Sequence, residues 1–198
     1  MGEELIHQPD GATPLSPEDL EGLIPGHIRT RRELDEWENR NVLKARTWAM
    51  SRRRQVLDEE FAKHLHRRMF NETWEWAGQY RKTEKNIGIA PEQLHQGAVR
   101  NLCEDTKARL IAGEGVADAA IWFHHRLTVI HPFANGNGRH ARLITELLLL
   151  SHDHAPFTWG MGDLSHAGDV SACYINALQE ADKGDFRSLK KFVRLSGN

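Results

Sequence analysis

The chain has 198 residues, enough for one domain with a substantial core and too few for two large ones. Its 26 lysine and arginine residues against 28 aspartate and glutamate residues give a formal charge of −2, which argues against a nucleic-acid or membrane-surface partner. Cys103 and Cys173 have neither disulfide nor metal-ligand spacing, and no apolar run approaches the ~20 residues of a membrane span. We therefore expect a cytoplasmic protein with no signal peptide and no membrane partner.

The first segment, residues 1–29, is expected to form an arm ahead of the main domain at 30–198. It is rich in proline and turn residues, and its one apolar group, Leu20, Leu23 and Ile24, predicts a single short helix. Thr30 followed by Glu33 has the form of a capping box, and apolar residues then recur at helical spacing. This pattern predicts a helix over about 30–52.

The next elements are a second helix, a short β-hairpin and a third helix. Residues 57–72 repeat the helical pattern, and Gly78 follows its end. Residues 80–90 (YRKTEKNIGIA) mix β-forming residues with asparagine and glycine, which favours a hairpin. From Pro91, a residue suited to the first helical position, the pattern predicts one helix to about Ile111.

The remaining chain is predicted to be helical around one polar turn. Apolar residues line one face from Ala117 to Ile130, and the segment RHARLITELLLLS that begins at Arg139 is apolar nearly all round, which predicts a central buried helix. Two further helices are expected near 164–182 and 186–196. The sequence thus predicts a mainly α fold.

The turn between the two central helices, HPFANGNGRHAR, carries the strongest chemical signal. Gly136 and Gly138 permit a nest of backbone N–H groups at a helix N-terminus, a favourable site for phosphate. Arg139 offers a planar fork of donors, and Arg142, one turn on, could reach a second phosphate. His131 titrates near neutral pH and could accept a proton from a hydroxyl. The turn therefore predicts a polyphosphate site with a general base.

Two other interpretations of this turn remain open. The string GNGRHA fits the loose dinucleotide-binding fingerprint, but Pro132 would interrupt the preceding strand and no alternating βαβ units flank it. The same residues could also be purely structural, with His131 as a hydrogen-bonded histidine and the arginines in ion pairs.

The turn also resembles the Fic signature, HxFx(D/E/N)GNGRxxR, matched at His131, Phe133, Gly136, Asn137, Gly138, Arg139 and Arg142. The resemblance extends to WAGQYR with NIG before the turn, and to YINALQEADKGD after it. It implies an all-α Fic-type helical bundle with a short β-hairpin flap. It also implies a protein adenylyltransferase, which moves AMP from ATP to a Tyr, Thr or Ser hydroxyl of a target protein.

The same resemblance implies roles for individual residues. His131 would be the general base, and the nucleotide would be held by Asn135, Gly136, Asn137, Gly138, Arg139 and Arg142. Asn135 stands where many relatives carry the Asp or Glu that holds Mg²⁺, and an amide is a weaker ligand for this hard cation. The flap over 81–89 would pair with the backbone of the target through Lys82, Thr83, Asn86, Ile87 and Gly88.

The arm resembles two further Fic features. Glu21-Gly22 in SPEDLEG is an imperfect match to an inhibitory (S/T)xxxE(G/N) motif, which implies that Glu21 competes with nucleotide at Arg142. The arm and the segment RRELDEWENRN resemble the mobile mystery protein B subgroup, which implies a small helix-turn-helix partner of the toxin–antitoxin kind. Two alternatives stay open: a nucleotide-binding regulatory module without turnover, which Asn135 favours, and a phosphotransferase on the same scaffold.

Overall fold

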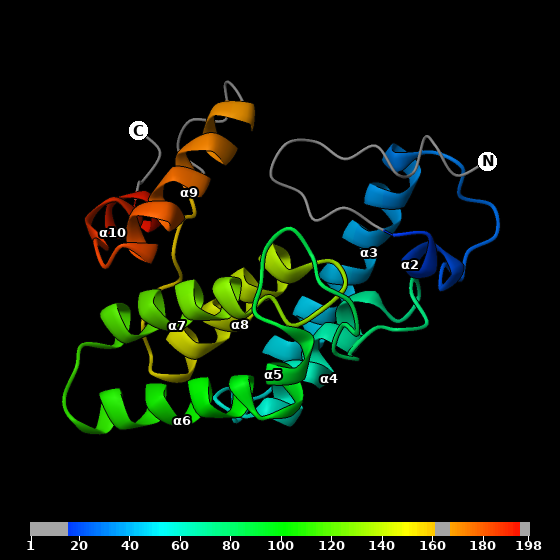
Figure 1. Cartoon of the computed structure of the whole chain (residues 1–198). Coiled ribbons are helices and arrows are strands. Elements are labelled where there is room, and N and C mark those ends of the chain that lie inside the picture. The colour runs from blue at the N-terminus through cyan, green and yellow to red at the C-terminus, as the bar shows by residue number, and fades with distance from the viewer. Residues whose placement is uncertain (1–15, 161–166, 195–198) are drawn as a thin grey trace.

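The computed structural model describes residues 16–160 and 167–194, with backbone alone at 167–170. Helices make up its regular structure, as Figure 1 shows: α2 (Pro17–Glu21), α3 (Arg31–Met50), α4 (Glu59–Phe70), α5 (Pro91–His95), α6 (Ala98–Ile111), α7 (Val116–Ile130), α8 (Asn137–Ser151), α9 (Ala167–Asp182) and α10 (Arg187–Val193). Within these described ranges, β-pairing is limited to one isolated bridge between Leu23 and Trp74. The mainly α class expected from the sequence is confirmed.

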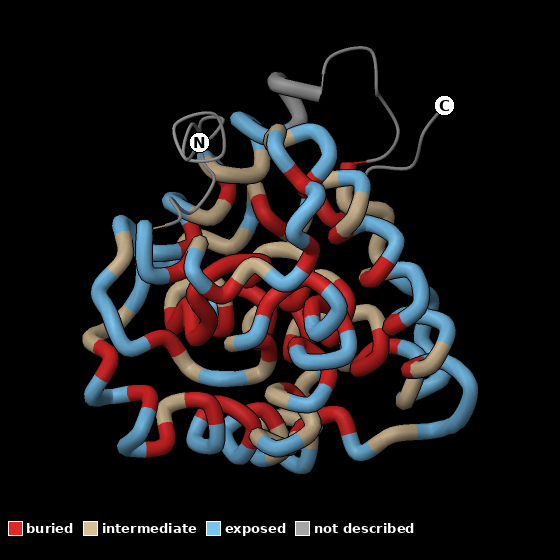
Figure 2. Tube along the Cα trace, turned by 90° about the vertical axis from the view of Figure 1, so that its right-hand side faces the viewer, coloured by how far each residue is buried: buried red, intermediate tan, exposed pale blue. Residues whose placement is uncertain are grey.

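Helices α7 and α8 form the centre of the bundle. Helix α7 packs against α6, α8 and α10, while α8 also packs against α3 and α4 (Figure 1). The inward side chains of the pair are fully buried, including Phe123 and Leu127 on α7 and Ile144 and Leu148 on α8. Figure 2 shows the buried segments gathered in the middle of the molecule. The turn that joins α7 to α8 is therefore fixed at both ends by the core.

The helix starts follow the local chemistry of the sequence. The Thr30 side chain accepts a hydrogen bond from the Glu33 N–H, and the Glu33 carboxylate accepts one from the Thr30 N–H, so the predicted capping box is confirmed. Asp58 caps α4 with its side chain alone, accepting from the Phe61 N–H at 2.9 Å. The expected helices at 30–52 and 57–72 correspond to α3 and α4.

The single helix expected from Pro91 to Ile111 is wrong, because the chain breaks at Gly97. This residue has φ 93°, a left-handed conformation that cannot continue an α-helix. The segment therefore forms α5 and α6. The last two predicted helices correspond to α9 and α10, and residues 164–166, 195 and 196 lie outside the described residues.

The hairpin expected over 80–90 is also wrong, because this segment forms bends and irregular backbone with no strand. A side chain takes the place of a β-ladder. The Arg81 guanidinium donates hydrogen bonds to the carbonyl of Thr83, at 2.9 Å, and to the carbonyl of Ile89. These two bonds join the ends of the loop, which we call the flap (residues 81–89).

The described part of the arm, residues 16–29, contacts the turn that follows α4. The Ile24 N–H donates to the Thr73 carbonyl and the Glu75 N–H donates to the Gly22 carbonyl, both at 2.9 Å. The short helix expected here is present as α2. Among the helices that the structure describes, none is both long and apolar enough to cross a bilayer.

Candidate functional site

The turn between α7 and α8 is held in a shape that few residues allow. His131 ends α7 with φ 51° and ψ 61°, and Gly136 precedes α8 with φ 75°, both in the left-handed region. A Cβ atom on Gly136 would overlap the ring of Phe70. Glycine is therefore required at 136 both by conformation and by space.

The side chain of Asn137 closes the turn on itself. Its Oδ1 accepts a hydrogen bond from the Phe133 N–H at 2.9 Å, and its Nδ2 donates to the Phe133 carbonyl at 2.7 Å. Asn137 therefore uses its amide inside the loop, and its backbone N–H is what it could offer a phosphate. Phe133 has no exposed surface.

A buried histidine of α4, His66, packs against the turn. The His66 ring stacks on Phe133 with centroids 3.7 Å apart, and its Nδ1 accepts a hydrogen bond from the Gly78 N–H at 3.0 Å. Nε2 must then carry the proton, and it donates to the Asn135 carbonyl at 3.0 Å. Burial lowers the pKa of His66 well below its ordinary value, so the ring stays neutral in this role.

His131 is buried and neutral at physiological pH. Only 7% of its surface is exposed, and desolvation, opposed by a hydrogen bond to the backbone of Thr128, lowers its pKa to about 4. Its Nδ1 lies 3.3 Å from the Thr128 carbonyl, which favours the tautomer protonated at Nδ1. In that tautomer the basic lone pair is on Nε2, as general-base chemistry requires.

The flap lies directly against His131. Arg81 donates from Nε to the His131 carbonyl at 2.7 Å, so one guanidinium binds both ends of the flap and the end of α7. A Cβ atom on Gly88 would lie 3.0 Å from Cβ of His131, and Gly88 has φ 125°. The flap and the candidate base are therefore adjacent.

The flap residues expected to contact a target are on the surface. Lys82, Thr83, Asn86, Ile87 and Gly88 are all exposed, and Ile87 exposes 47% of its surface although it is apolar. Their backbone groups form no strand, so an edge for β-pairing is not preformed.

Lys85 differs from its neighbours on the flap. It forms an ion pair with Asp19 of α2, in which both side chains are mostly buried. Asp19 also accepts a hydrogen bond from the Ser16 N–H, and its carbonyl accepts one from Trp76 Nε1 at 3.0 Å. The arm is thus connected to the flap through Asp19.

Asn135 fits Mg²⁺ poorly as a ligand. Its Oδ1 accepts a hydrogen bond from the Gly136 N–H at 2.7 Å, which fixes the oxygen on that side of the amide. Its buried Nδ2 has no hydrogen-bond partner in the structure. An amide nitrogen donates protons and does not coordinate a cation, whereas it suits a phosphate oxygen. Across the described residues, no group of three or more His, Cys, Asp or Glu side chains could hold a metal ion.

The two arginines of the turn contact different partners. Arg139 Nη2 lies 2.5 Å from Oε2 of Glu38, a residue of α3 with no exposed surface. The guanidinium carbon of Arg142 lies 5.8 Å from the ring centre of Tyr174 on α9. The Tyr174 hydroxyl in turn hydrogen-bonds His124 Nε2 at 2.7 Å. Each arginine is thus supported by a different helix.

Glu21 is exposed at the end of α2. No hydrogen bond or ion pair between Glu21 and Arg142 occurs in the described part of the chain. The structure thus places the flap against His131, at the start of the turn that leads to both arginines, and gives Glu21 no contact with Arg142 among the described residues.

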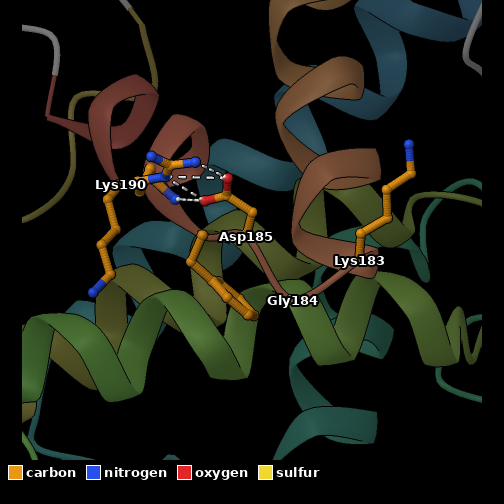
Figure 3. Close-up of a pocket in the computed structure, with 6 residues that line it drawn as sticks. Lys183, Gly184, Asp185 and Lys190 are labelled. Atoms are coloured by element: carbon orange, nitrogen blue, oxygen red, sulfur yellow. Dashed lines mark hydrogen bonds and ion pairs between the residues drawn. The ribbon is translucent and has the colours of Figure 1, made fainter.

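A separate depression of about 520 Å³ lies at the turn between α9 and α10. Figure 3 shows Lys183 and Lys190 pointing away from each other there, with Asp185 between them. Asp185 is paired with Arg187 at 2.6 Å. Because the turn from His131 to Arg142 contributes none of its lining residues, this depression is not the candidate site.

The sequence pattern that defines the Fic/DOC family matches residues 56–149. This part of the chain is a Fic/DOC family domain. The match covers α4, the flap, the turn and α8 as far as Leu149, whereas the arm and Glu38 lie before it. The match agrees with the geometry of the turn, because Gly136, Asn137 and Arg139 each make different contacts there.

Known proteins with similar sequences carry one activity in their names. The chain is 36% identical over 138 residues to the probable protein adenylyltransferase y4lH of Sinorhizobium fredii, covering 63% of this chain and 66% of that protein. It is 28% identical over 121 residues to the protein adenylyltransferase fic-1 of Caenorhabditis briggsae, covering 59% of this chain and 22% of that one. The chain thus spans less than two thirds of each relative.

A solved structure with the same fold is the BepC protein of Bartonella tribocorum with bound AMPPNP. The TM-score is 0.67 at 20% sequence identity, over 90% of this chain and 96% of that one. At this identity the likeness establishes the Fic fold.

Three supporting residues of the Fic site were not found from the sequence: Glu38, His66 and Arg81. Glu38 could have been found, because it lies on the buried stripe of its helix between Leu34 and Asn41, where a carboxylate needs a partner. Nothing in the local sequence of His66 or Arg81 indicates that they contact the turn.

Proposed function

We propose that this protein is an adenylyltransferase that moves AMP from ATP to a hydroxyl group of a target protein. The observation that carries the proposal is the position of His131. A buried, neutral imidazole lies between a loop suited to phosphate and a flap with exposed residues. This arrangement supports a base that receives a hydroxyl from the flap side while the loop holds the nucleotide.

In the proposed reaction the hydroxyl oxygen attacks the α-phosphorus of ATP. The bond from that phosphorus to the bridging β-phosphate oxygen breaks, pyrophosphate leaves, and the hydroxyl proton passes to Nε2 of His131. The backbone N–H groups of Gly136, Asn137 and Gly138 at the start of α8, with Arg139 and Arg142, would stabilise the phosphate charge. The names of the two relatives and the AMPPNP held by the BepC protein support this assignment.

Mg²⁺ is proposed only as a partner of the nucleotide. Bound to phosphate oxygens, it would reduce the negative charge that the loop must hold. Asn135 would then act on the phosphate itself, by donating from Nδ2.

Incubation with a target lysate and ATP labelled at the α-phosphate tests the reaction. Labelled protein bands are expected from the parent and from His154→Ala, which changes an exposed histidine, and not from His131→Ala. A label that survives in His131→Ala would remove this residue from the mechanism. Transfer from ATP labelled at the γ-phosphate would instead establish a phosphotransferase.

The second candidate is a nucleotide-binding module without turnover, which the neutral Asn135 favours. Calorimetry that shows ATP binding by the parent, with no modified protein in any lysate, would support it. A small helix-turn-helix partner and a cytoplasmic location also stay predictions. Co-purification with the protein encoded beside this one tests the partner.

We also propose that Glu21 lets the arm inhibit turnover. The connection from Asp19 to Lys85 supports a link between arm and flap. Glu21→Gly should raise turnover, and Glu18→Gly, which changes another exposed acid of α2, should not. Equal rates in both variants would show that Glu21 does not inhibit.

A further inference from the structure

Glu38 is a buried carboxylate with both oxygens engaged. It lies in the middle of α3, 101 residues before Arg139 in sequence. Its Oε1 accepts a hydrogen bond from Trp74 Nε1 at 2.6 Å, and its Oε2 accepts one from Arg139 Nη2 at 2.5 Å. Trp74 is itself buried and stacks on Trp76 with ring centres 4.9 Å apart. The hydrogen bond from Trp74 therefore fixes the carboxylate independently of Arg139.

Two side chains, Glu38 and Phe70, contact the guanidinium of Arg139. Glu38 binds one nitrogen, and the guanidinium carbon lies 5.0 Å from the ring centre of Phe70 on α4. The Arg139 side chain keeps 24% of its surface exposed, whereas that of Glu38 has none. A guanidinium has five N–H donors, so one contact with a carboxylate leaves donors for a second anion.

Glu38 could either compete with a phosphate for Arg139 or orient Arg139 toward it. Competition requires the ion pair to break, which would leave a buried carboxylate without its cation. Removing one partner from a buried ion pair shifts the folding equilibrium toward the unfolded state by about 150-fold or more. A charge-assisted hydrogen bond to phosphate contributes about 10- to 150-fold. The pair should therefore persist when a nucleotide binds.

We propose that Glu38 is a positioning residue for phosphate binding, which fixes the guanidinium of Arg139 beside the first turn of α8. The inference rests on the proposed function, because it assigns the anion at Arg139 to the phosphates of ATP. A free arginine side chain loses rotamer freedom when it binds an anion. In this chain that freedom is already lost on folding, through Glu38 and Phe70.

Calorimetric titration with ATP, without any target protein, tests the proposal. Glu38→Gln keeps the shape of the side chain and an acceptor for Trp74, and removes the charge that holds Arg139. We expect its Kd for ATP to rise about 10-fold, by analogy with the rotamer entropy of arginine. Glu36→Gln, an exposed acid two residues away on α3, should bind ATP as the parent does.

A double variant shows whether Glu38 acts through Arg139. Arg139→Ala alone leaves a buried carboxylate unpaired and is the variant most at risk of misfolding. The variant E38Q/R139A removes both charges and avoids this problem. It should bind ATP no more weakly than R139A, because Glu38 has no effect without Arg139. If R139A does not fold, the ATP Kd of E38Q/R139A should be higher than that of E38Q, since positioning needs the arginine.

Steady-state kinetics separate positioning from a loss of overall structure. Glu38→Gln should raise KM for ATP while kcat and KM for the target change less than 3-fold, an order-of-magnitude expectation for an effect on ground-state binding. ATP binding as tight as in the parent, or tighter, would overturn the inference and leave the proposed transfer intact. Weaker ATP binding in E38Q together with no transfer by the parent would support Glu38 and reject the transfer. A parent that binds no ATP would reject both.

Discussion

Arg81 donates a hydrogen bond from Nε to the carbonyl oxygen of His131, at 2.7 Å, while its two terminal nitrogens bind the carbonyls of Thr83 and Ile89. The backbone of the candidate base and the two ends of the flap thus share one buried cation. No β-ladder is needed for the flap to hold its place beside α7.

Arg81→Lys should therefore loosen the flap. An ammonium cannot reach three carbonyls that a planar fork binds together, so carbonyl oxygens are left buried without donors. We expect the free energy of unfolding to fall by about 2 kcal/mol and kcat/KM for the target to fall more than the affinity for ATP. Denaturant titration and ATP calorimetry measure the two effects. Lys82→Met, an exposed neighbour, should leave the free energy of unfolding unchanged.

The pH dependence of transfer should report the lowered pKa of His131. Because burial lowers this pKa to about 4, the imidazole is neutral and basic above that pH. The rate of transfer, as kcat/KM, should rise from acid pH with an apparent pKa near 4 and stay level through neutral pH. A rise centred near the ordinary value of about 6.5 would show that His131 is exposed in the working enzyme.

Of the two glycines, Gly136 should be required for folding and Gly138 for binding ATP. Gly136→Ala forces a Cβ into the Phe70 ring at φ 75°, so the free energy of unfolding should fall by about 2–4 kcal/mol. A Cβ on Gly138 meets nothing within 4 Å, and alanine favours a helix there. Gly138→Ala should fold as well as the parent and bind ATP more weakly, if phosphate approaches the backbone at this point. Thermal melts and ATP calorimetry on the pair decide this.

Stability should fall in mild acid because several histidines are buried without charge. Desolvation lowers the pKa of His124 to about 3 and that of His140 to about 4, and also lowers the pKa of His66. The unfolded chain binds these protons at about pH 6.5 and the folded chain does not. The stabilisation is therefore complete above that pH and is lost as pH falls toward the folded pKa values, by about 1.4 kcal/mol per pH unit for each histidine.

Urea titrations between pH 7.5 and pH 5 measure this slope. His66→Leu should reduce it by about one proton, and His154→Leu, at an exposed position, should not change it. An unchanged slope in His66→Leu would mean that His66 titrates normally in the folded protein.

Asn135→Asp should make ATP binding depend more strongly on Mg²⁺. The new carboxylate can still accept from the Gly136 N–H, but it replaces a buried donor by a negative charge. Without Mg²⁺ the variant should bind ATP more weakly than the parent, and Mg²⁺ should restore binding. Titrations with and without EDTA compare the two chains, and an equal response to EDTA would contradict the prediction.

The helices and the turn could be predicted from the sequence because their signals are local. Thr30 and Glu33 set the start of α3, and the pattern from His131 to Arg142 specifies a loop between helices. The break at Gly97 was missed because a glycine inside a helical pattern is often tolerated, and its left-handed φ depends on how α5 and α6 pack. The flap was missed for a different reason: β-forming residues predicted pairing, whereas Arg81 satisfies the carbonyls.

The supports of the site could not be predicted, because they join segments far apart in sequence. His66 reaches the Asn135 carbonyl 69 residues away, and Glu38 reaches Arg139 across 101. Both contacts depend on how α3 and α4 pack against α8, which no single segment encodes.

The bond pair between Asn137 and Phe133 has a thermodynamic consequence for the arriving nucleotide. A loop that is already closed by its own amide does not have to be ordered by its ligand, so the heat capacity change on association should reflect only the surfaces that meet. Nucleotide capture at this turn is then close to the docking of two rigid bodies, with its entropy cost incurred earlier, during the folding of the chain.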